Sequence, residues 1–171
     1  MEDIDSKAKL TAGGIGGLLL ITILIITSLD ATSVEVALCT GVIDGDTIEL
    51  STGKRVRYIG VNTPEVHRVD AITRELGKEA KAYNEGLVIG KTVRLLFDVQ
   101  QKDEYGNFLA YVYVGRTFVN AELVRAGYAS AARHPPNVRH AELFKGLERE
   151  AKENDRGLWS VTKKARHRLH K

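Results

Sequence analysis

The segment VEVALCTGVIDGDTIELSTGKRVRYIG, residues 34–60, carries the strongest evidence for the fold of this chain. Its first part alternates apolar and polar residues, which is typical of a strand with one buried face. A turn at residues 44–46 (DGD) leads into a second strand pattern at 47–50. A turn with Gly53 then leads into a third at 55–60, which completes a hairpin pattern. Three such strands in succession predict a strongly bent meander.

The hydrophobic period changes after this meander. An amphipathic helix with a glycine stop at Gly90 is predicted by apolar residues that recur at helical spacing. These residues are Leu76, Ala80, Tyr83 and Leu87. Strand patterns then return at residues 92–98 and 108–114.

Two further helices close the pattern. Asn120 is expected to cap the first, which stops at Gly127, and Asn137 is expected to cap the second. The order βββαββαα fits a five-stranded Greek-key barrel with three α-helices packed around it, the OB-fold arrangement. We therefore predict a mainly β, α+β domain over residues 34–162.

The composition is that of one globular domain with extensions. The chain has 171 residues, of which 43% are apolar and 27% charged, which is enough to bury a core. The net charge is +3, but residues 163–171 hold five Lys or Arg and no acid, and residues 34–162 are neutral. The basic balance is therefore a property of the tail and not evidence for a basic groove. The single cysteine, Cys39, excludes an intramolecular disulfide.

Residues 10–29 carry no charge and would form a helix of about 30 Å, long enough to cross a bilayer. They follow a short N-terminus at 1–9 and precede a linker at 30–33. An uncleaved signal-anchor is favoured over a cleaved signal peptide, because the run exceeds the usual apolar length of about 7 to 15 residues. Lys7 and Lys9 precede it, so we predict a single-pass location in the cell membrane with the domain outside. Cleavage would make the protein secreted.

Oxygen-bearing side chains gather at two turns. Asp44 and Asp46 flank a glycine, and Asn62, Thr63 and Glu65 lie on a second turn that the hairpin could bring alongside. Carboxylates, an amide and backbone carbonyls suit a hard cation such as Ca²⁺. Each turn alone is ordinary turn sequence. Their combination indicates metal-assisted phosphodiester chemistry.

Arg57 precedes the second turn on the third strand. Its guanidinium could bind two phosphate oxygens and neutralise charge on a pentacovalent phosphorus. Glu65 could orient or deprotonate a water for in-line attack. His67, His134 and His140 have no spacing that pairs them as a zinc site.

Several stretches resemble the staphylococcal nuclease (thermonuclease) family from about residue 36 to 160. They are VIDGDT (42–47), RVRYIGVNTPE (55–65) and DEYGNFLAYVY (103–113), followed by NAELVRAGYA and the closing GLW. The resemblance implies an OB-fold barrel with three helices. It also implies Ca²⁺-dependent hydrolysis of DNA and RNA at the 5′ P–O bond, which leaves 3′-phosphates.

The resemblance also assigns roles to single residues. Asp46 corresponds to the family's first calcium carboxylate, and Thr63 to the residue whose backbone carbonyl binds the metal. Asp44 corresponds to an acid near the metal that does not touch it. Arg57 matches the first phosphate-binding arginine, and Glu65 matches the general base.

Two positions depart from the family prototype. Asn62 stands in place of the second metal aspartate, which removes a negative charge and lowers the expected calcium affinity. Asn107 replaces the second phosphate arginine, close to Tyr105, which matches a tyrosine near the nucleotide's phosphate. The loss of one donor to a transition-state anion can lower the rate by about 10² to 10³. Arg133 is the candidate replacement, and Arg133→Ala is expected to cut activity with little loss of stability.

The main alternative is an OB-fold module that binds nucleic acid without cutting it, and a weaker one is an anchored interaction domain that uses the basic tail. Binding modules rely on stacking aromatics and basic grooves. Here aromatics make up 6%, and Asp46, Arg57 and Glu65 are all present. We therefore predict a monomeric, Ca²⁺-dependent endonuclease that acts on DNA and RNA, with single-stranded or denatured substrate preferred.

Overall fold

A computed structural model describes residues 34–66 and 70–160, which belong to one compact unit of the chain. The predictions for residues 1–9, 10–29, 30–33 and 163–171 lie outside the described residues. The domain predicted at 34–162 is described up to residue 160, apart from the gap at 67–69.

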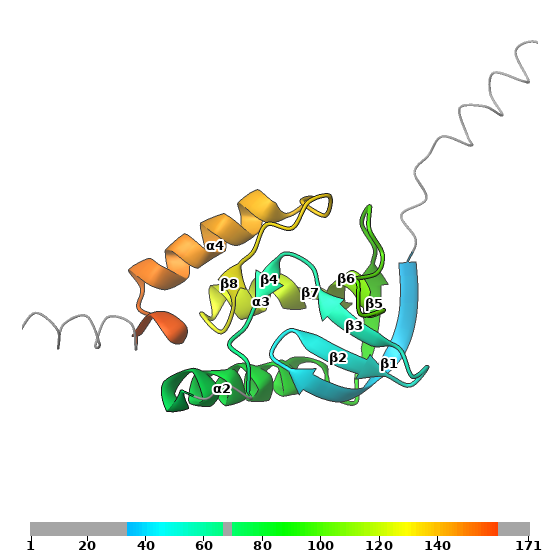
Figure 1. Ribbon diagram of the computed structural model, residues 1–171, viewed down its shortest axis with the longest axis horizontal. Helices are drawn as coiled ribbons and strands as arrows, with labels where there is room; N and C mark the ends of the chain where they lie inside the picture. The colour runs from blue at the N-terminus through cyan, green and yellow to red at the C-terminus, as the bar shows by residue number, and fades with distance from the viewer. Residues whose placement is uncertain (1–33, 67–69, 161–171) are drawn as a thin grey trace, which may run out of the picture. The chain divides into compact units, whose positions relative to one another are not determined.

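Five strands close into a barrel (Figure 1). They are β1 (Val34–Asp44), β2 (Thr47–Leu50), β3 (Arg55–Tyr58), β5 (Thr92–Leu96) and β6 (Phe108–Val114). Antiparallel pairs give the order β3-β2-β1-β5-β6, and a parallel pairing between β3 and β6 closes the ring. The predicted five-stranded barrel is therefore confirmed.

Three shorter strands lie outside this ring. β4 (Val61–Asn62) pairs antiparallel with β8 (Ser130–Ala131), and β7 (Thr117–Phe118) extends the sheet beside β6. The first pairing matters for the site. It places Asn62 opposite Ser130, whose hydroxyl donates to the Asn62 carbonyl at 3.1 Å.

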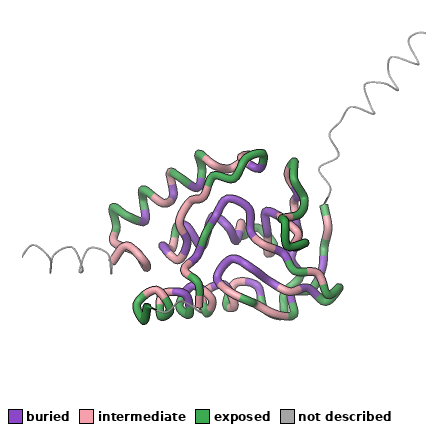
Figure 2. Tube along the Cα trace, in the orientation of Figure 1, coloured by how far each residue is buried: buried purple, intermediate pink, exposed green. Residues whose placement is uncertain are grey.

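The described residues also form three α-helices, which confirms the α+β class. They are α2 (Ala71–Val88), α3 (Val119–Arg125) and α4 (Ala141–Glu153). α2 contacts β1, and α3 contacts both β6 and α4. Figure 2 shows that most of the barrel interior is buried, whereas the outer side of α2 is exposed.

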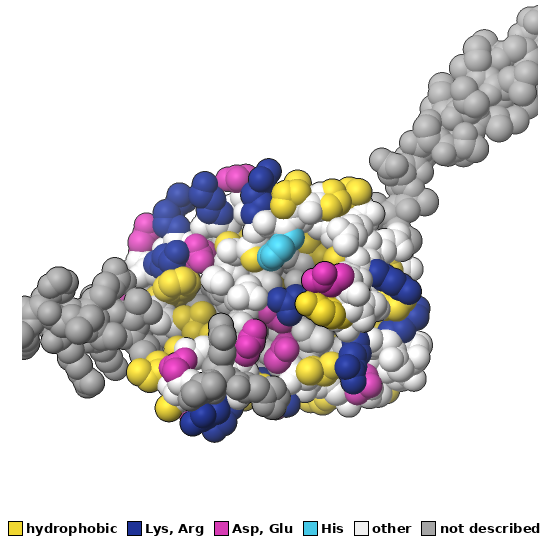
Figure 3. Space-filling model, in the orientation of Figure 1, with side chains coloured by type: hydrophobic (Ala, Val, Ile, Leu, Met, Phe, Trp, Pro, Cys, Tyr) yellow, Lys and Arg dark blue, Asp and Glu magenta, His cyan; other side chains and the backbone are white. Residues whose placement is uncertain are grey.

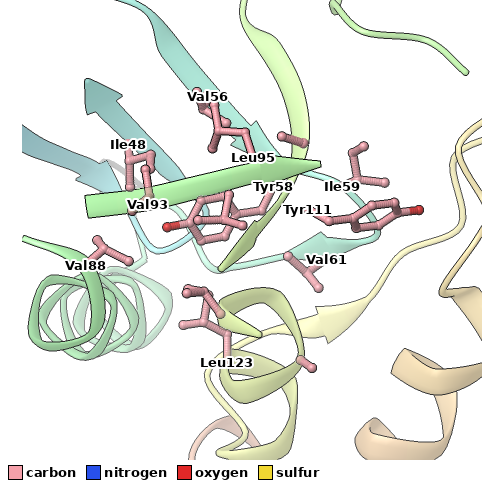
Figure 4. Packing of buried hydrophobic residues seen from close by; sticks show 14 of the residues in the cluster. Ile48, Val56, Tyr58, Ile59, Val61, Val88, Val93, Leu95, Tyr111 and Leu123 are labelled. Carbon is pink, nitrogen blue, oxygen red and sulfur yellow. The ribbon is translucent and has the colours of Figure 1, made fainter. Parts of the chain in front are cut away.

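The core is made of barrel side chains covered by α2 and α3. Figure 4 shows Val88 of α2 and Leu123 of α3 facing side chains from the strands, such as Val93. All three are fully buried. The helices therefore cover the parts of the barrel that the strands alone leave open.

The buried face of α2 is rotated from the predicted stripe. Gly77, Ala80, Asn84 and Val88 are buried, whereas three of the four predicted residues are only half-buried. Asn84 lies inside because its Oδ1 accepts a hydrogen bond of 3.0 Å from the Tyr58 hydroxyl. A buried polar group with a partner carries little penalty, so an asparagine can replace an apolar residue here.

The two predicted asparagine caps are wrong. Asn120 lies inside α3, fully buried, and its amide bonds the backbone of Ile59 and Val112. α4 begins at Ala141, and Asn137 instead bonds the backbone of another loop. Both amides satisfy backbone groups from distant parts of the chain, which a local capping pattern does not reveal.

The prediction of a single-pass location in the cell membrane is corrected here. No helix in the described part of the chain is both long and apolar enough to cross a bilayer. The longest helix in the described part of the chain, α2, has 18 residues but carries charges such as Arg74, Glu75 and Lys78. The apolar run at 10–29 lies outside the described residues.

Candidate active site

A cavity of about 690 Å³ opens beside β3. Its lining combines acids, arginines and an aromatic ring, and includes Asp44, Arg55, Arg57, Tyr105 and Asn107. Figure 3 shows acidic side chains grouped near the middle of one face, with basic side chains beside them. The three sequence stretches singled out above therefore meet at one cavity.

Asp46 is the buried centre of this site. It is only 2% exposed, yet both of its carboxylate oxygens have donors. Oδ1 accepts from Arg57 Nη1 at 3.0 Å and from the Thr47 hydroxyl at 3.1 Å. Oδ2 accepts from the backbone N–H of Thr63 at 2.9 Å. The carboxylate thus joins the DGD turn to the turn at residues 62–65.

Arg57 connects the same two turns through its guanidinium. While Nη1 bonds Asp46, Nη2 donates to Asn62 Oδ1 at 3.0 Å. The strand pairing of Arg57 with Thr47 fixes where this side chain leaves the sheet. The Arg57 side chain is 35% exposed, so part of the guanidinium remains open to the cavity.

The electrostatics of Asp46 favour a positive charge at this place. Burial raises the pKa of Asp46 to about 6, Arg57 opposes that rise, and the neighbouring Asp44 adds to it. Asp44 Oδ1 also accepts a hydrogen bond of 3.1 Å from the Asp46 backbone N–H. Two carboxylates therefore lie close together with one arginine between the turns, which leaves negative charge for a cation to balance.

The donor chemistry fits a hard divalent cation. Carboxylate oxygens of Asp46 and Asp44, the amide oxygen of Asn62 and backbone carbonyls are the ligand types that Ca²⁺ prefers. Among the described residues, no group of three or more His, Cys, Asp or Glu could hold a metal ion. A cation bound here would therefore need neutral oxygens as ligands in addition to the carboxylates.

Glycines allow the turns to approach one another. A Cβ on Gly45 would lie 2.7 Å from the Thr63 side chain, and a Cβ on Gly77 would lie 2.8 Å from the Pro64 carbonyl oxygen. Gly77 therefore lets α2 pack directly against the turn that carries Glu65. Thr63 is buried and Glu65 is exposed, outside the cavity lining. Sequence reasoning missed Gly77, because a helical glycine gives no sign of what packs on it.

The turn at residues 103–107 is organised by Asp103. Its Oδ1 accepts from the backbone N–H groups of Tyr105 at 3.0 Å and Asn107 at 2.8 Å. Its Oδ2 accepts from Asn107 Nδ2, also at 2.8 Å. Tyr105 projects from this turn with 82% of its surface exposed. Asp103 was not among the predicted residues, although an aspartate at the start of a turn is its ordinary signal.

A second loop also contributes to the cavity lining. Asn137 Oδ1 accepts from the Gln100 N–H at 2.8 Å, and Asn137 Nδ2 donates to the Gln100 carbonyl at 2.7 Å. His134, Pro135 and Asn137 line the cavity. Arg133, which precedes His134 in this loop, is exposed and lies outside the lining.

Comparison with known proteins gives consistent matches. Residues 55–161 match the family model described as staphylococcal nuclease homologue. The chain is 37% identical over 122 residues to a Thermonuclease from Staphylococcus hyicus, which covers 70% of this chain and 72% of that protein. It is 36% identical over 121 residues to a Thermonuclease from Staphylococcus intermedius, covering 69% and 72%. It is also 37% identical over 123 residues to Endonuclease YncB from Bacillus subtilis (strain 168), covering 69% and 58%.

Proposed function

This chain belongs to the staphylococcal nuclease family and is a hydrolase of the micrococcal nuclease type, and on that basis we propose that it is a Ca²⁺-dependent endonuclease. It would cleave DNA and RNA at the 5′ P–O bond and leave 3′-phosphates, with single-stranded or denatured substrate preferred. The observation that supports this proposal most strongly is the bridge that Arg57 forms between Asp46 and Asn62 at the edge of the cavity.

The cation would be held by oxygens that the two turns supply. We assign the Asp46 carboxylate, the Asn62 amide oxygen and the Thr63 backbone carbonyl to it, with Asp44 nearby as additional negative charge. When bound, such an ion neutralises phosphate charge and lowers the pKa of water. Burial of Asp46 supports this assignment, because a buried carboxylate gains most from a nearby positive charge.

Arg57 would stabilise the transition state. Its planar guanidinium can donate to two phosphate oxygens as negative charge builds up on the phosphorus. Such a donor is typically responsible for a factor of about 10² to 10³ in rate. In this role Arg57 would turn from Asn62 toward the substrate, and its exposed edge supports that movement.

Glu65 would act as the general base. It would take a proton from the attacking water as the new O–P bond forms and the bond from phosphorus to O5′ breaks. The leaving O5′ takes up a proton, and the phosphate stays on the 3′ side. The exposed position of Glu65 on the turn after Thr63 is compatible with contact to water and substrate.

Tyr105, Asn107 and Arg133 are proposed to contact the nucleic acid. Tyr105 is highly exposed on the cavity wall, where its ring or hydroxyl could meet a nucleotide. The Asn107 amide is bonded to Asp103, so it has less freedom to donate to a phosphate. That bond is the one observation that favours the second candidate function, a module that binds nucleic acid and cuts it slowly or not at all.

Product analysis tests the proposal. The full-length chain would be incubated with denatured DNA and with RNA, in Ca²⁺, in Mg²⁺ or with chelator, and the product ends identified. Internal cuts with 3′-phosphate ends that appear only with Ca²⁺ would support it. Cleavage that persists in chelator, or products with 5′-phosphates, would contradict it.

A further inference from the structure

We propose that Arg55 is a second phosphate-binding residue of this site and supplies the positive charge that Asn107 does not. This inference rests on the proposed nuclease function, because it concerns the same cavity and the same substrate. It differs from the expectation drawn from the sequence, which placed the second cation at Arg133.

Arg55 and Arg57 share one face of β3. Side chains two residues apart on a strand point to the same side, and their Cα atoms lie about 6.5 to 7 Å apart. Both arginines line the cavity. A nucleic-acid strand with a backbone phosphate bound to Arg57 would therefore pass close to Arg55.

Arg55 also lies beside Asn107. In the parallel pairing of β3 with β6, Val56 is opposite Phe108 and Arg57 is opposite Leu109. Extending this register by one residue places Arg55 next to Asn107, and neighbouring strands are about 4.8 Å apart. Both residues line the cavity. A positive charge at position 55 can therefore attract the same phosphate as a positive charge at position 107.

The charge of Arg55 is available to a ligand. Arg55 is exposed, and among the described residues no ion pair or hydrogen bond of its guanidinium is formed. Glu49 of β2 lies opposite Arg55 in the pairing of β2 with β3. The side chains of these two described residues form no ion pair. By contrast, Arg57 is engaged with Asp46 and Asn62.

Arg55 also matters for the charge balance of the cavity. Asp44, Asp103 and Glu104 line it, and of its described lining residues only Arg55 and Arg57 carry a permanent positive charge. A polyanionic substrate is repelled by the acids unless cations compensate them. With Arg57 bound to Asp46, Arg55 is the residue that can attract the phosphates before a cut is made.

The first test measures how binding depends on salt. The full-length chain, in chelator, is titrated into a fluorescent single-stranded oligonucleotide at several salt concentrations. Each phosphate contact contributes about 0.7 to the slope of log K against log salt for single strands. We expect Arg55→Ala to reduce the slope by about that amount and Arg55→Lys to retain it.

The matched control is Arg116→Ala, because Arg116 is exposed in the turn after β6 and lies outside the described cavity lining. It should leave the slope unchanged. An unchanged slope for Arg55→Ala, a loss seen with Arg133→Ala instead, or no binding by the wild type would overturn the proposal.

The second test moves the positive charge from position 55 on β3 to position 107, just before β6. Under Ca²⁺, Arg55→Ala should lower kcat/KM by about tenfold or more, chiefly through KM if Arg55 acts before the transition state. Adding Asn107→Arg to Arg55→Ala should restore most of this loss. A double variant as weak as Arg55→Ala would show that Arg55 has a structural role and overturn the proposal.

The two proposals fail separately. If the wild type cleaves nothing with any metal, the nuclease proposal fails, while the salt dependence of binding still decides the role of Arg55. If the wild type cleaves and Arg55→Ala matches it in slope and in kcat/KM, only the inference about Arg55 fails.

Discussion

Arg57 Nη1 lies 3.0 Å from Asp46 Oδ1, so the arginine of the third strand neutralises the buried carboxylate of the DGD turn. The two side chains differ in exposure, at 35% for Arg57 and 2% for Asp46. The pair therefore joins a solvent-facing cation to a buried anion. We expect both the stability of the site and its proposed chemistry to depend on this contact.

Removal of Arg57 should destabilise the metal-free protein. Arg57→Ala leaves the Asp46 carboxylate buried with fewer donors, which is expected to reduce the free energy of unfolding by about 1 to 3 kcal/mol. Asp46→Asn with Arg57→Ala should cost less than the sum of the single changes, because they share one interaction. Urea unfolding in chelator measures all three variants. Strict additivity would show that the ion pair contributes nothing to stability.

The stability of the metal-free protein should depend on pH through Asp46. Burial raises the pKa of Asp46 to about 6, so between about pH 4 and 6 the folded state holds a proton that the unfolded chain has released. The folded state then binds more protons, and the contribution of Asp46 to stability falls as the pH rises through this window.

The measurement compares wild type with Asp46→Asn in chelator. The unfolding free energy of the wild type should decline relative to Asp46→Asn between about pH 4 and 6.5, because the amide cannot ionise. If the pKa of Asp46 were ordinary, the difference in unfolding free energy between wild type and Asp46→Asn would stay constant across this pH range.

A charge at position 62 should strengthen cation binding. Asn62→Asp adds a carboxylate where the structure has an amide oxygen, and we expect Ca²⁺ affinity to rise tenfold or more, about 1.4 kcal/mol. That is well below the ~4 kcal/mol between unit charges 4 Å apart at an effective dielectric constant near 20, since Arg57 compensates part of the added charge. Calorimetric titration measures it, with Asn154→Asp as a control at an exposed helix end. Equal affinity for wild type and Asn62→Asp would remove position 62 from the proposed metal site.

Tyr105 should contribute to substrate binding and not to stability. It is 82% exposed on the cavity wall, so Tyr105→Ala should leave the unfolding midpoint nearly unchanged. Loss of a stacking partner would weaken binding of single-stranded DNA by about 1 to 3 kcal/mol. Tyr105→Phe separates the two contacts, since it retains the ring and removes the hydroxyl. If Tyr105→Ala binds single-stranded DNA as tightly as the wild type, Tyr105 has no part in substrate recognition.

Local sequence patterns were sufficient to predict the barrel and the approach of its two polar turns. The alternation at residues 34–60 predicted the first three strands, and the two turns that they connect do meet at Asp46, Arg57 and Asn62. This worked because the period of a strand and the position of a turn are encoded in short stretches. The exact contacts within the site were not predicted.

The errors concern residues whose partners are distant in sequence. Asn120 and Asn137 look like helix caps, yet their amides bond backbone groups at Ile59 and Gln100. The face of α2 was misplaced for the same reason, because Asn84 is buried against Tyr58. No local pattern shows which distant backbone or side chain will satisfy a buried amide.

The position of Arg55 could be predicted only in part from the sequence. The period of two along β3 places it on the same face as Arg57, which follows from the sequence alone. Its proximity to Asn107 required the parallel register between β3 and β6, which joins segments about 50 residues apart in the chain. Arg133 lies in a loop, and no strand period predicts which way its side chain points.

The decisive experiment for the nuclease proposal measures Ca²⁺-dependent cleavage of denatured DNA by the full-length wild type beside Arg57→Ala and Glu65→Gln. We expect the wild type to cleave DNA and chelator to abolish this cleavage. Each variant should lose a factor of about 10² or more in kcat, and Glu65→Gln should still bind the oligonucleotide. Wild-type protein that binds DNA but cuts none with any metal, or variants as active as the wild type, would contradict it.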